Sequence, residues 1–215
     1  AVATGLLDHE RKRPVATAPG SDMPEKKEKR YKWRRDDYRE KTKGLLMVNT
    51  GDGKGKTTAA IGVLVRAAGR GLKCCMIQFM KSKHDRYGEH ESLEKLGVEV
   101  HTMGDGFTWD TKDKSQDIRT SEETWAVCVK KMRSGEYELL VFDELVYVLD
   151  YKFLDIKRVL DEIAAVRETQ PHLHIIATGR NAPPELVEAA DLVTEMKEIK
   201  HPFHAGIFAQ QGIEF

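Results

Sequence analysis

The chain has 215 residues, of which 40% are hydrophobic and 33% are charged, a composition that suits one domain with a sizeable core. Lysine plus arginine equals aspartate plus glutamate, 35 of each, so no global charge attracts the chain to nucleic acid or an acidic membrane. No apolar run approaches the roughly 18 residues that a membrane span requires. We therefore expect a soluble protein with neither nucleic acid nor a membrane as partner.

The cysteines bear on the compartment. Cys74, Cys75 and Cys128 show no C-x-x-C spacing and cannot all pair, which favours a reducing compartment and argues against a zinc site. The first 24 residues contain acidic side chains, which mitochondrial presequences generally lack, and no apolar signal core. The sequence thus predicts a cytoplasmic protein and makes a mitochondrial one less favoured.

The amino-terminal region divides into two parts. Residues 1–24 lack periodic apolar side chains and contain several prolines, so we predict that they are disordered. Residues 25–43 carry ten basic and five acidic side chains, net +5, which leaves the rest of the chain at net −5. We predict a charged helix here, and its Tyr31, Trp33 and Tyr38 leave two interpretations open, a solvated arm or a docking element.

From residue 44 onward the pattern becomes regular and predicts one domain that reaches residue 215. The predicted strands are 45–50, 73–79, 98–103, 137–143, 173–178 and 191–196. The predicted helices are 56–69, 89–96, 115–133, 155–168 and 184–190. This alternation indicates an α/β fold with a mostly parallel sheet and helices on both faces.

A glycine-rich loop follows the first predicted strand. Gly51, Gly53 and Gly55 separate an apolar run, 45–48, from a helical pattern that starts at Thr57. Glycines allow successive backbone N–H groups to converge on one anion, and the start of a helix offers further free donors. The order of strand, glycine loop and helix is therefore typical of a site for a polyphosphate, although an ordinary glycine-rich turn is the simpler alternative.

Within this loop, Lys56 can reach the terminal phosphates and the Thr57 hydroxyl can ligate Mg²⁺, as in a Walker A loop. Thr50 stands where the standard G-x-x-x-x-G-K-T pattern has its first glycine. The predicted nucleotide-binding residues are Gly51, Asp52, Gly53, Lys54, Gly55, Lys56, Thr57 and Thr58.

A second motif ends the predicted strand 137–143. Asp143 and Glu144 follow a continuous apolar run, as in a Walker B strand, and carboxylates there lie at the sheet edge where ligands bind. One of the two would hold Mg²⁺, an ion that prefers oxygen ligands, and the sequence does not say which. The alternative is that both simply cap the next helix.

Other polar and aromatic residues follow neighbouring strands. Gln78 and Thr178-Gly179-Arg180 end two strands at the same predicted edge, where Arg180 contacts a phosphate or a second substrate, or else forms a surface ion pair. Phe107 and Trp109 lie in a glycine-flanked loop that matches neither helix nor strand periodicity. They are interpreted either as core residues or as an apolar wall for a bulky ligand beside the nucleotide.

Together these motifs resemble the P-loop class of corrinoid adenosyltransferases, the ATP:cob(I)alamin adenosyltransferase family. The resemblance covers roughly residues 28–215. The family loop reads G-N-G-K-G-K-T, which does not require a glycine at the position of Thr50. Asp52 here replaces the asparagine that is usual in this loop. The matching residues are 50–60, 78–79, 106–109, 143–145, 178–180, 200–201, 205–206 and 211–213. The implied fold is a P-loop NTPase-like, RecA-like sheet of six strands.

The resemblance implies transfer of the 5′-deoxyadenosyl group of ATP to Co(I) of a corrinoid, with release of triphosphate. The corrinoid is cobalamin, cobinamide or a cobyrinic acid derivative, and a reduced flavoprotein supplies the electron. Lys56 and Arg180 are then catalytic, Mg²⁺ lies at Thr57 with Asp143 or Glu144, and Phe107 and Trp109 exclude the axial base of the cobalt.

The family also implies a homodimer in which residues 25–43 cap the corrinoid site. Two other functions remain open from the sequence, a P-loop ATPase or small-molecule kinase and a RecA-like nucleic-acid motor. The acidic balance outside residues 25–43 disfavours the motor.

Overall fold

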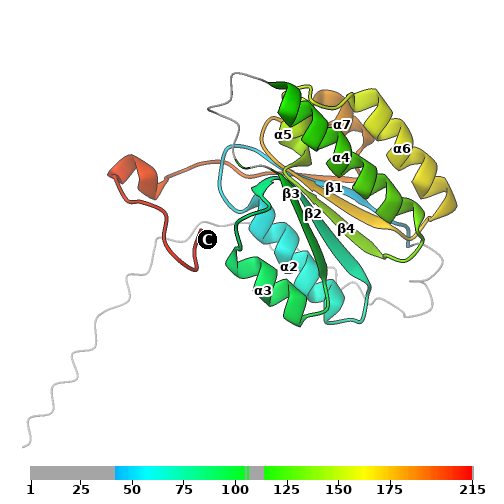
Figure 1. Cartoon of the computed structure of the whole chain (residues 1–215), viewed down its shortest axis with the longest axis horizontal. Helices are drawn as coiled ribbons and strands as arrows, with labels where there is room; N and C mark the ends of the chain where they lie inside the picture. The colour runs from blue at the N-terminus through cyan, green and yellow to red at the C-terminus, as the bar shows by residue number, and fades with distance from the viewer. Residues whose placement is uncertain (1–41, 105, 107–113, 215) are drawn as a thin grey trace, which may run out of the picture. The chain divides into compact units, whose positions relative to one another are not determined.

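The computed structural model describes residues 42–104, 106 and 114–214 (Figure 1). Its strands are β1 (Leu46–Thr50), β2 (Cys74–Ser82), β3 (Glu99–Gly104), β4 (Leu139–Asp143), β5 (His174–Thr178) and β6 (Leu192–Glu195). Its helices are α2 (Lys56–Ala68), α3 (Gly88–Lys95), α4 (Lys114–Arg133), α5 (Leu145–Asp150), α6 (Ile156–Thr169), α7 (Pro184–Ala189) and the short 3₁₀ helix η2 (Pro202–Ala205).

The six strands form one sheet in the order β3-β2-β4-β5-β1-β6, and all neighbouring strands run parallel. β5 separates β1, which leads into the glycine loop, from β4, which ends at Asp143. In the register of the sheet Gln78 lies opposite Asp143, and Asn49 lies opposite Thr178. The predicted parallel sheet is confirmed, and the carboxyl ends of four strands meet at one edge.

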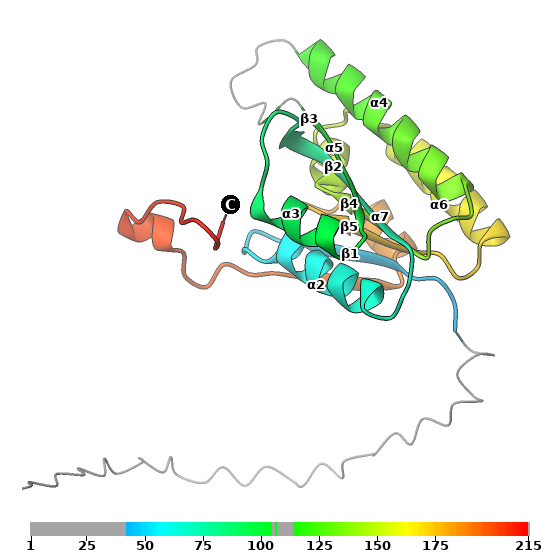
Figure 2. The same ribbon diagram turned by 60° about the horizontal axis from the view of Figure 1, so that its bottom comes forward.

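Helices cover both faces of the sheet, as predicted (Figure 2). α2 and α3 pack on one face, while α4, α5, α6 and α7 lie on the other. α2 turns Ala60, Leu64 and Ala67 toward the sheet, a helical spacing that buries one face only. Because the inner strands are covered on both sides, their sequences are continuous apolar runs.

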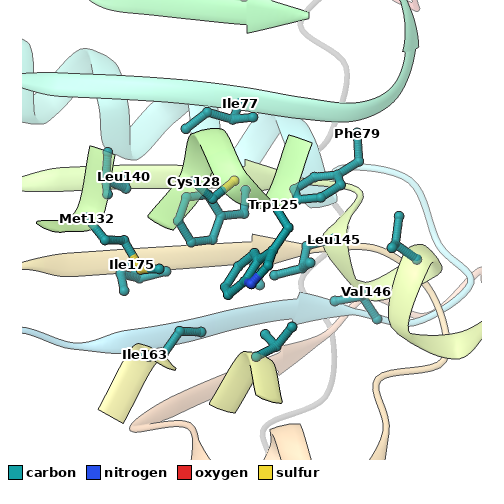
Figure 3. Close-up of a cluster of buried hydrophobic side chains, with 14 of the residues drawn as sticks. Ile77, Phe79, Trp125, Cys128, Met132, Leu140, Leu145, Val146, Ile163 and Ile175 are labelled. Carbon is teal, nitrogen blue, oxygen red and sulfur yellow. The ribbon is translucent and has the colours of Figure 1, made fainter. Parts of the chain in front are cut away.

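The larger core cluster lies between the sheet and α4 to α7 (Figure 3). Trp125 of α4 lies edge-on to Phe142 of β4, with 6.1 Å between the ring centroids. Cys128 follows Trp125 by three residues and Met132 follows Cys128 by four, and all three side chains are buried. Burying such side chains contributes roughly 1.5–3 kcal/mol each, so this face of α4 anchors the helix to the sheet.

Three elements differ from the predictions by more than two residues at a boundary. β2 continues to Ser82, three residues beyond its predicted end, and neither α5 nor η2 was among the predicted helices. The strand stops at Asp143 because Glu144 has a left-handed backbone, φ 65°, which breaks the extended conformation before α5 begins. The strand thus ends where it was predicted to end, and the apolar residues after it form a short buried helix, which hydrophobicity alone does not distinguish from a strand.

The end of the chain leaves the sheet after β6 (Figure 1). β6 is the edge strand beside β1, and the segment that follows carries η2 and returns to the glycine loop, where Glu214 pairs with Lys54. In the part of the chain that the structure describes, no helix is long and apolar enough to cross a membrane. All three cysteines are buried and free of disulfides.

Several predictions fall on residues outside the described ranges. These are the disordered segment 1–24, most of the charged helix 25–43, and both loop aromatics, Phe107 and Trp109. Thr42 and Lys43, the last residues of the predicted helix, are described and are not helical.

Candidate functional site

The glycine loop connects β1 to α2 as the sequence predicts. Gly55 has φ 108°, a left-handed backbone that favours glycine, and the first turn of α2 begins directly after it at Lys56. Gly53 lies against the segment after β6, because its N–H donates to Met196 O and a Cβ there would lie 2.7 Å from the carbonyl carbon of Lys197. The loop is therefore held from outside by the strand-to-tail segment, which leaves its inner side open.

Thr50 accounts for the missing first glycine of the motif. Thr50 is the last residue of β1, and its hydroxyl accepts a hydrogen bond from Ala182 N at 3.1 Å. Since the residue is extended and paired, it needs no glycine, and its side chain links the phosphate loop to the segment after β5.

Lys56 points back over the loop. Its ammonium donates to Gly51 O at 2.7 Å and to Gly53 O at 2.6 Å. Burial and the nearby Arg180 lower the pKa of Lys56, while Asp52 and Glu144 oppose this shift. An anion in the loop would offer this cation better partners than two neutral carbonyls.

Asp143 is the centre of a buried hydrogen-bond network. Its Oδ1 accepts from the hydroxyls of Thr57 and Thr178, each at 2.7 Å, and its Oδ2 accepts from Gln78 Nε2 at 3.2 Å. These three partners come from α2, β5 and β2, so the carboxylate ties the helix after the loop to two strands. Thr57 and Asp143, two residues that the sequence assigned to a candidate magnesium site, are thus in direct contact.

Gln78 is itself fixed by His90, a residue that the sequence interpretation did not single out. Tyr87 N donates to His90 Nδ1 at 3.3 Å, so the ring proton lies on Nε2 and is donated to Gln78 Oε1 at 2.7 Å. Thr102 Oγ1 donates to the same amide oxygen. Burial lowers the pKa of His90, which keeps the ring neutral in this chain of bonds.

Glu144 differs from its neighbour Asp143 in having no hydrogen-bond partner for one oxygen. Among the described residues, Oε2 is inaccessible to solvent and unpartnered, although the backbone N–H of Glu144 donates to Thr178 Oγ1. Burial and the adjacent Asp143 raise the pKa of Glu144 to about 8, against the opposing effect of Lys81 and Lys56. A buried carboxylate oxygen without a donor is poised for a cation.

The residues converge on one cavity of about 770 Å³ at the carboxyl edge of the sheet. Its wall carries four cations and three carboxylates from the loop, β2, α3, the β4–α5 junction, the β5–α7 segment and the tail. The charged lining residues are Lys54, Lys56, Lys81, Arg180, Glu89, Glu144 and Glu214. Such a volume falls in the range of small-molecule sites, and the cations suit a polyanion.

Arg180 lines this cavity, as the sequence suggested, beside Tyr147 of α5. Within the described part of the chain no carboxylate pairs with its guanidinium, so a surface ion pair does not account for it there. Gly55, Thr57 and Thr58 also line the cavity, whereas Asp52 is exposed on the loop and Asp143 lies behind the wall.

Lys81, Glu89 and Glu214 were not predicted as site residues. Lys81 sits just beyond the predicted end of its strand, and Glu89 lies on a short polar helix, so neither position carries a motif. Lys81 follows Gln78 by three residues and so lies near the sheet edge where the strands end. This position is the sequence feature that could have indicated a site residue.

A group with metal-binding side chains lies elsewhere, at Cys75, Glu99 and His101. Glu99 already accepts hydrogen bonds from Lys131, Tyr137 and His101, and burial raises the pKa of the Cys75 thiol to about 12. An ammonium at the carboxylate and a protonated thiol both disfavour a cation there.

Comparison with known proteins identifies the family. Residues 42–215 match the family described as ATP:corrinoid adenosyltransferase BtuR/CobO/CobP. A corrinoid adenosyltransferase from Sinorhizobium sp is 42% identical over 177 residues, covering 80% of this chain and 81% of that protein. Another from Pseudomonas aeruginosa is 42% identical over 175 residues, covering 80% and 84%. The chain belongs to this family.

As a corrinoid adenosyltransferase the chain is an enzyme, and the resemblance seen in its motifs is confirmed. Membership of a family that acts on ATP and a corrinoid replaces the alternative predictions of an ATPase, a kinase or a nucleic-acid motor. Among solved structures, the flagellar accessory protein FlaH from Methanocaldococcus jannaschii is 7% identical with a TM-score of 0.49, covering 71% of this chain and 70% of that one.

Proposed function

We propose that this corrinoid adenosyltransferase binds ATP with its triphosphate in the glycine loop and transfers the 5′-deoxyadenosyl group to Co(I) of a corrinoid. The observation that supports this placement is the bond between Thr57 and Asp143, at 2.7 Å, at a cavity that Thr57 and Glu144 both line, where Glu144 Oε2 has no partner among the described residues. Cobalt donates its electron pair to C5′, the C5′–O5′ bond breaks, and the oxygen leaves with the triphosphate.

Mg²⁺ is the cation that this arrangement fits. The Glu144 Oε2 atom is buried without a donor, and the Thr57 hydroxyl lies at the same wall, so both supply the hard oxygen ligands that Mg²⁺ prefers. Asp143 is better suited to hold Thr57 than to bind the ion directly, because both of its oxygens accept protein hydrogen bonds. When bound, the ion would neutralise charge on the triphosphate.

The remaining chemistry belongs to the loop. The nucleophile is the metal of the substrate and needs no protein base, so catalysis consists of aligning cobalt with C5′ and stabilising the leaving triphosphate. Lys56 would turn from the Gly51 and Gly53 carbonyls to the phosphates, and Lys54 and Arg180 would add positive charge at the cavity wall.

The corrinoid side of the site rests on residues outside the described ranges. We assign Phe107 and Trp109 to an apolar wall that keeps the axial base from cobalt, because a metal without that donor accepts an electron more readily. Residues 25–43 would cap the corrinoid. A separate reduced flavoprotein would supply the electron in a reducing, cytoplasmic setting, which the three free buried cysteines suit.

A second copy of the chain is the partner that the exposed apolar tail suggests. Among the described strands β6 pairs on one side only, with β1, and Leu192 within it is 51% exposed. Ile199, Phe203, Phe208 and Ile213 extend this exposed apolar surface along the tail. Such a surface marks an interaction site, and a homodimer would cover it.

The dimer is tested by light scattering. Wild type should give twice the mass of one chain, and the double variant Phe203→Ser with Phe208→Ser should give the mass of one chain. A monomeric wild type would contradict the dimer.

The function is tested by incubating the protein with ATP, Mg²⁺ and chemically reduced cob(I)alamin and identifying both products. Adenosylcobalamin and tripolyphosphate in equal amounts are expected. Lys56→Ala should slow the reaction by about 100-fold or more, since a cation at the leaving group is worth roughly 3 kcal/mol. ADP with orthophosphate, and unmodified corrinoid, would refute the proposal.

A further inference from the structure

Lys81 is the cation of the cavity that no recognised motif explains. It lies near the end of β2 and lines the same wall as Lys56, Thr57 and Glu144. Its side chain is only 15% exposed, so it is largely withdrawn from solvent. Withdrawing a lysine ammonium from water is costly, so its charge requires a partner.

The surrounding residues hold the ammonium of Lys81 in place. It pairs with the Glu89 carboxylate of α3, itself 17% exposed, and lies 4.7 Å from the centroid of the Tyr87 ring. Burial lowers the pKa of Lys81, but Asp143 and the bond to Glu89 outweigh this and raise it, so the side chain stays charged. A fixed, protonated cation therefore faces the cavity.

Two carboxyl groups, those of Glu89 and Glu144, interact electrostatically with the Lys81 ammonium. Glu89 pairs with it directly, and Glu144 lies close enough for its pKa to be lowered by both Lys81 and Lys56. Lys81 and Lys56 thus face Glu144 from β2 and from the loop. A polyanion that enters between them meets positive charge from two sides.

We propose that Lys81 is a fourth cation on the triphosphate, beside Lys54, Lys56 and Arg180 and on the β2 side of the cavity, and that the Tyr87 ring positions it while Glu89 competes for its charge. This inference rests on the proposed function for the identity of the substrate. When the cavity is empty, Glu89 neutralises Lys81; when triphosphate is bound, the ammonium is shared between the carboxylate and a phosphate oxygen. Lys81 then stabilises the negative charge that grows on the leaving group.

A purely structural ion pair gives a different expectation. If Lys81 only anchors α3 to β2, removing either partner should disturb the site alike. If it binds phosphate, the two changes act differently, because Lys81→Met removes the cation and Glu89→Gln removes only its competitor. Tripolyphosphate affinity should then fall in the first variant and stay the same or rise in the second.

Lys73 supplies a matched control. It lies directly before the other end of β2, pairs with Glu136 at 2.5 Å and lies 5.1 Å from the centroid of the Tyr137 ring. Lys73→Met thus removes a lysine with the same kinds of partner, next to the opposite end of that strand and away from the cavity.

The test measures the binding of tripolyphosphate with Mg²⁺ by calorimetry, together with kcat and KM for ATP. Lys81→Met should weaken tripolyphosphate at least about tenfold and lower kcat, while Lys73→Met stays within about twofold of wild type. Lys81→Arg should recover most of the affinity. If the Lys81→Met variant does not fold, Lys81→Met with Glu89→Gln removes the whole pair and should show the same loss.

Wild-type affinity in Lys81→Met, or an equal loss in Glu89→Gln, would overturn the inference. Because tripolyphosphate binding requires no corrinoid, this result is independent of the proposed reaction. Failure of the wild-type protein to adenosylate reduced corrinoid would instead refute the proposed function.

Discussion

The Thr57 hydroxyl donates a hydrogen bond to Asp143 Oδ1 at 2.7 Å and so joins the first turn of α2 to the end of β4. Because β5 lies between β1 and β4, Thr178 can reach the same oxygen from the intervening strand. Gln78 occupies the other oxygen from the opposite side. These bonds give Asp143 a positioning role and leave Glu144 as the carboxylate free to bind a cation.

Asp143→Asn should destabilise the empty protein. Asparagine presents one acceptor and two donors where the native site has three donors, so at least one buried hydrogen bond is lost. We expect the free energy of unfolding to fall by about 1–3 kcal/mol, measured by urea denaturation without nucleotide. Unchanged stability would mean that the bonds to Thr57, Thr178 and Gln78 are not formed in solution.

Glu144→Gln, unlike Asp143→Asn, should change the Mg²⁺ requirement of the reaction without destabilising the empty protein. The variant replaces a buried carboxyl, whose Oε2 has no hydrogen-bond partner among the described residues, with a neutral amide, so stability without Mg²⁺ should be unchanged or greater. The Mg²⁺ concentration for half-maximal transfer should rise about tenfold, because a carboxylate ligand becomes a neutral amide. Glu188→Gln, on α7, is the control. Identical Mg²⁺ titrations for Glu144→Gln and wild type would place the ion elsewhere.

The sequence predicted the layered fold well because its strands and helices differ in period and are separated by glycine and polar turns. It indicated that Thr57 and Asp143 lie at one edge of the sheet, because the ends of parallel strands share that edge. It could not separate Asp143 from Glu144, since that distinction depends on the left-handed backbone of Glu144 and on hydrogen bonds from three distant elements.

The same limit applies to His90 and Lys81. His90 acts through Gln78, and Lys81 faces the cavity only because β2 continues past its predicted end. Neither role follows from local spacing, because each depends on the packing of α3 against β2 and β3. The Glu214 contact with Lys54 depends likewise on the return of the tail to the loop.

Glu99 should give the protein a specific acid sensitivity. Burial disfavours its ionised form, but hydrogen bonds from Lys131, Tyr137 and His101 outweigh this and lower its pKa from the usual 4.5 to about 2. A depressed carboxyl pKa stabilises the fold fully above pH 4.5 and loses that effect as the pH falls through about 2.

The stability difference between wild type and Glu99→Gln should therefore be constant near neutral pH and shrink below pH 4.5. It should also decrease with added salt, because Glu99 is 38% exposed. Glu94→Gln, in the exposed Arg86–Glu94 pair, serves as control. A difference that does not change between pH 6 and pH 3 would contradict the assigned role.

Phe107→Ala with Trp109→Ala should separate cobalt reduction from group transfer. If these residues exclude the axial base, the variant should lose the four-coordinate Co(II) absorption bands in the ATP complex, and reduction should stall. Chemically reduced cob(I)alamin should restore much of the rate, because the phosphate contacts remain. If the two rings were core residues, the variant would lose about 3–5 kcal/mol for each and would also lose ATP binding.

Adenosyl transfer and phosphoryl transfer differ in which bond of ATP breaks. ATP carrying ¹⁸O at the 5′ position can be turned over with reduced corrinoid, and the products can be separated and weighed by mass spectrometry. Attack by cobalt at C5′ predicts that all of the label appears in tripolyphosphate and none in the adenosyl product. Label retained on an adenosine-containing product, with cleavage at a phosphorus atom, would contradict adenosyl transfer by this chain.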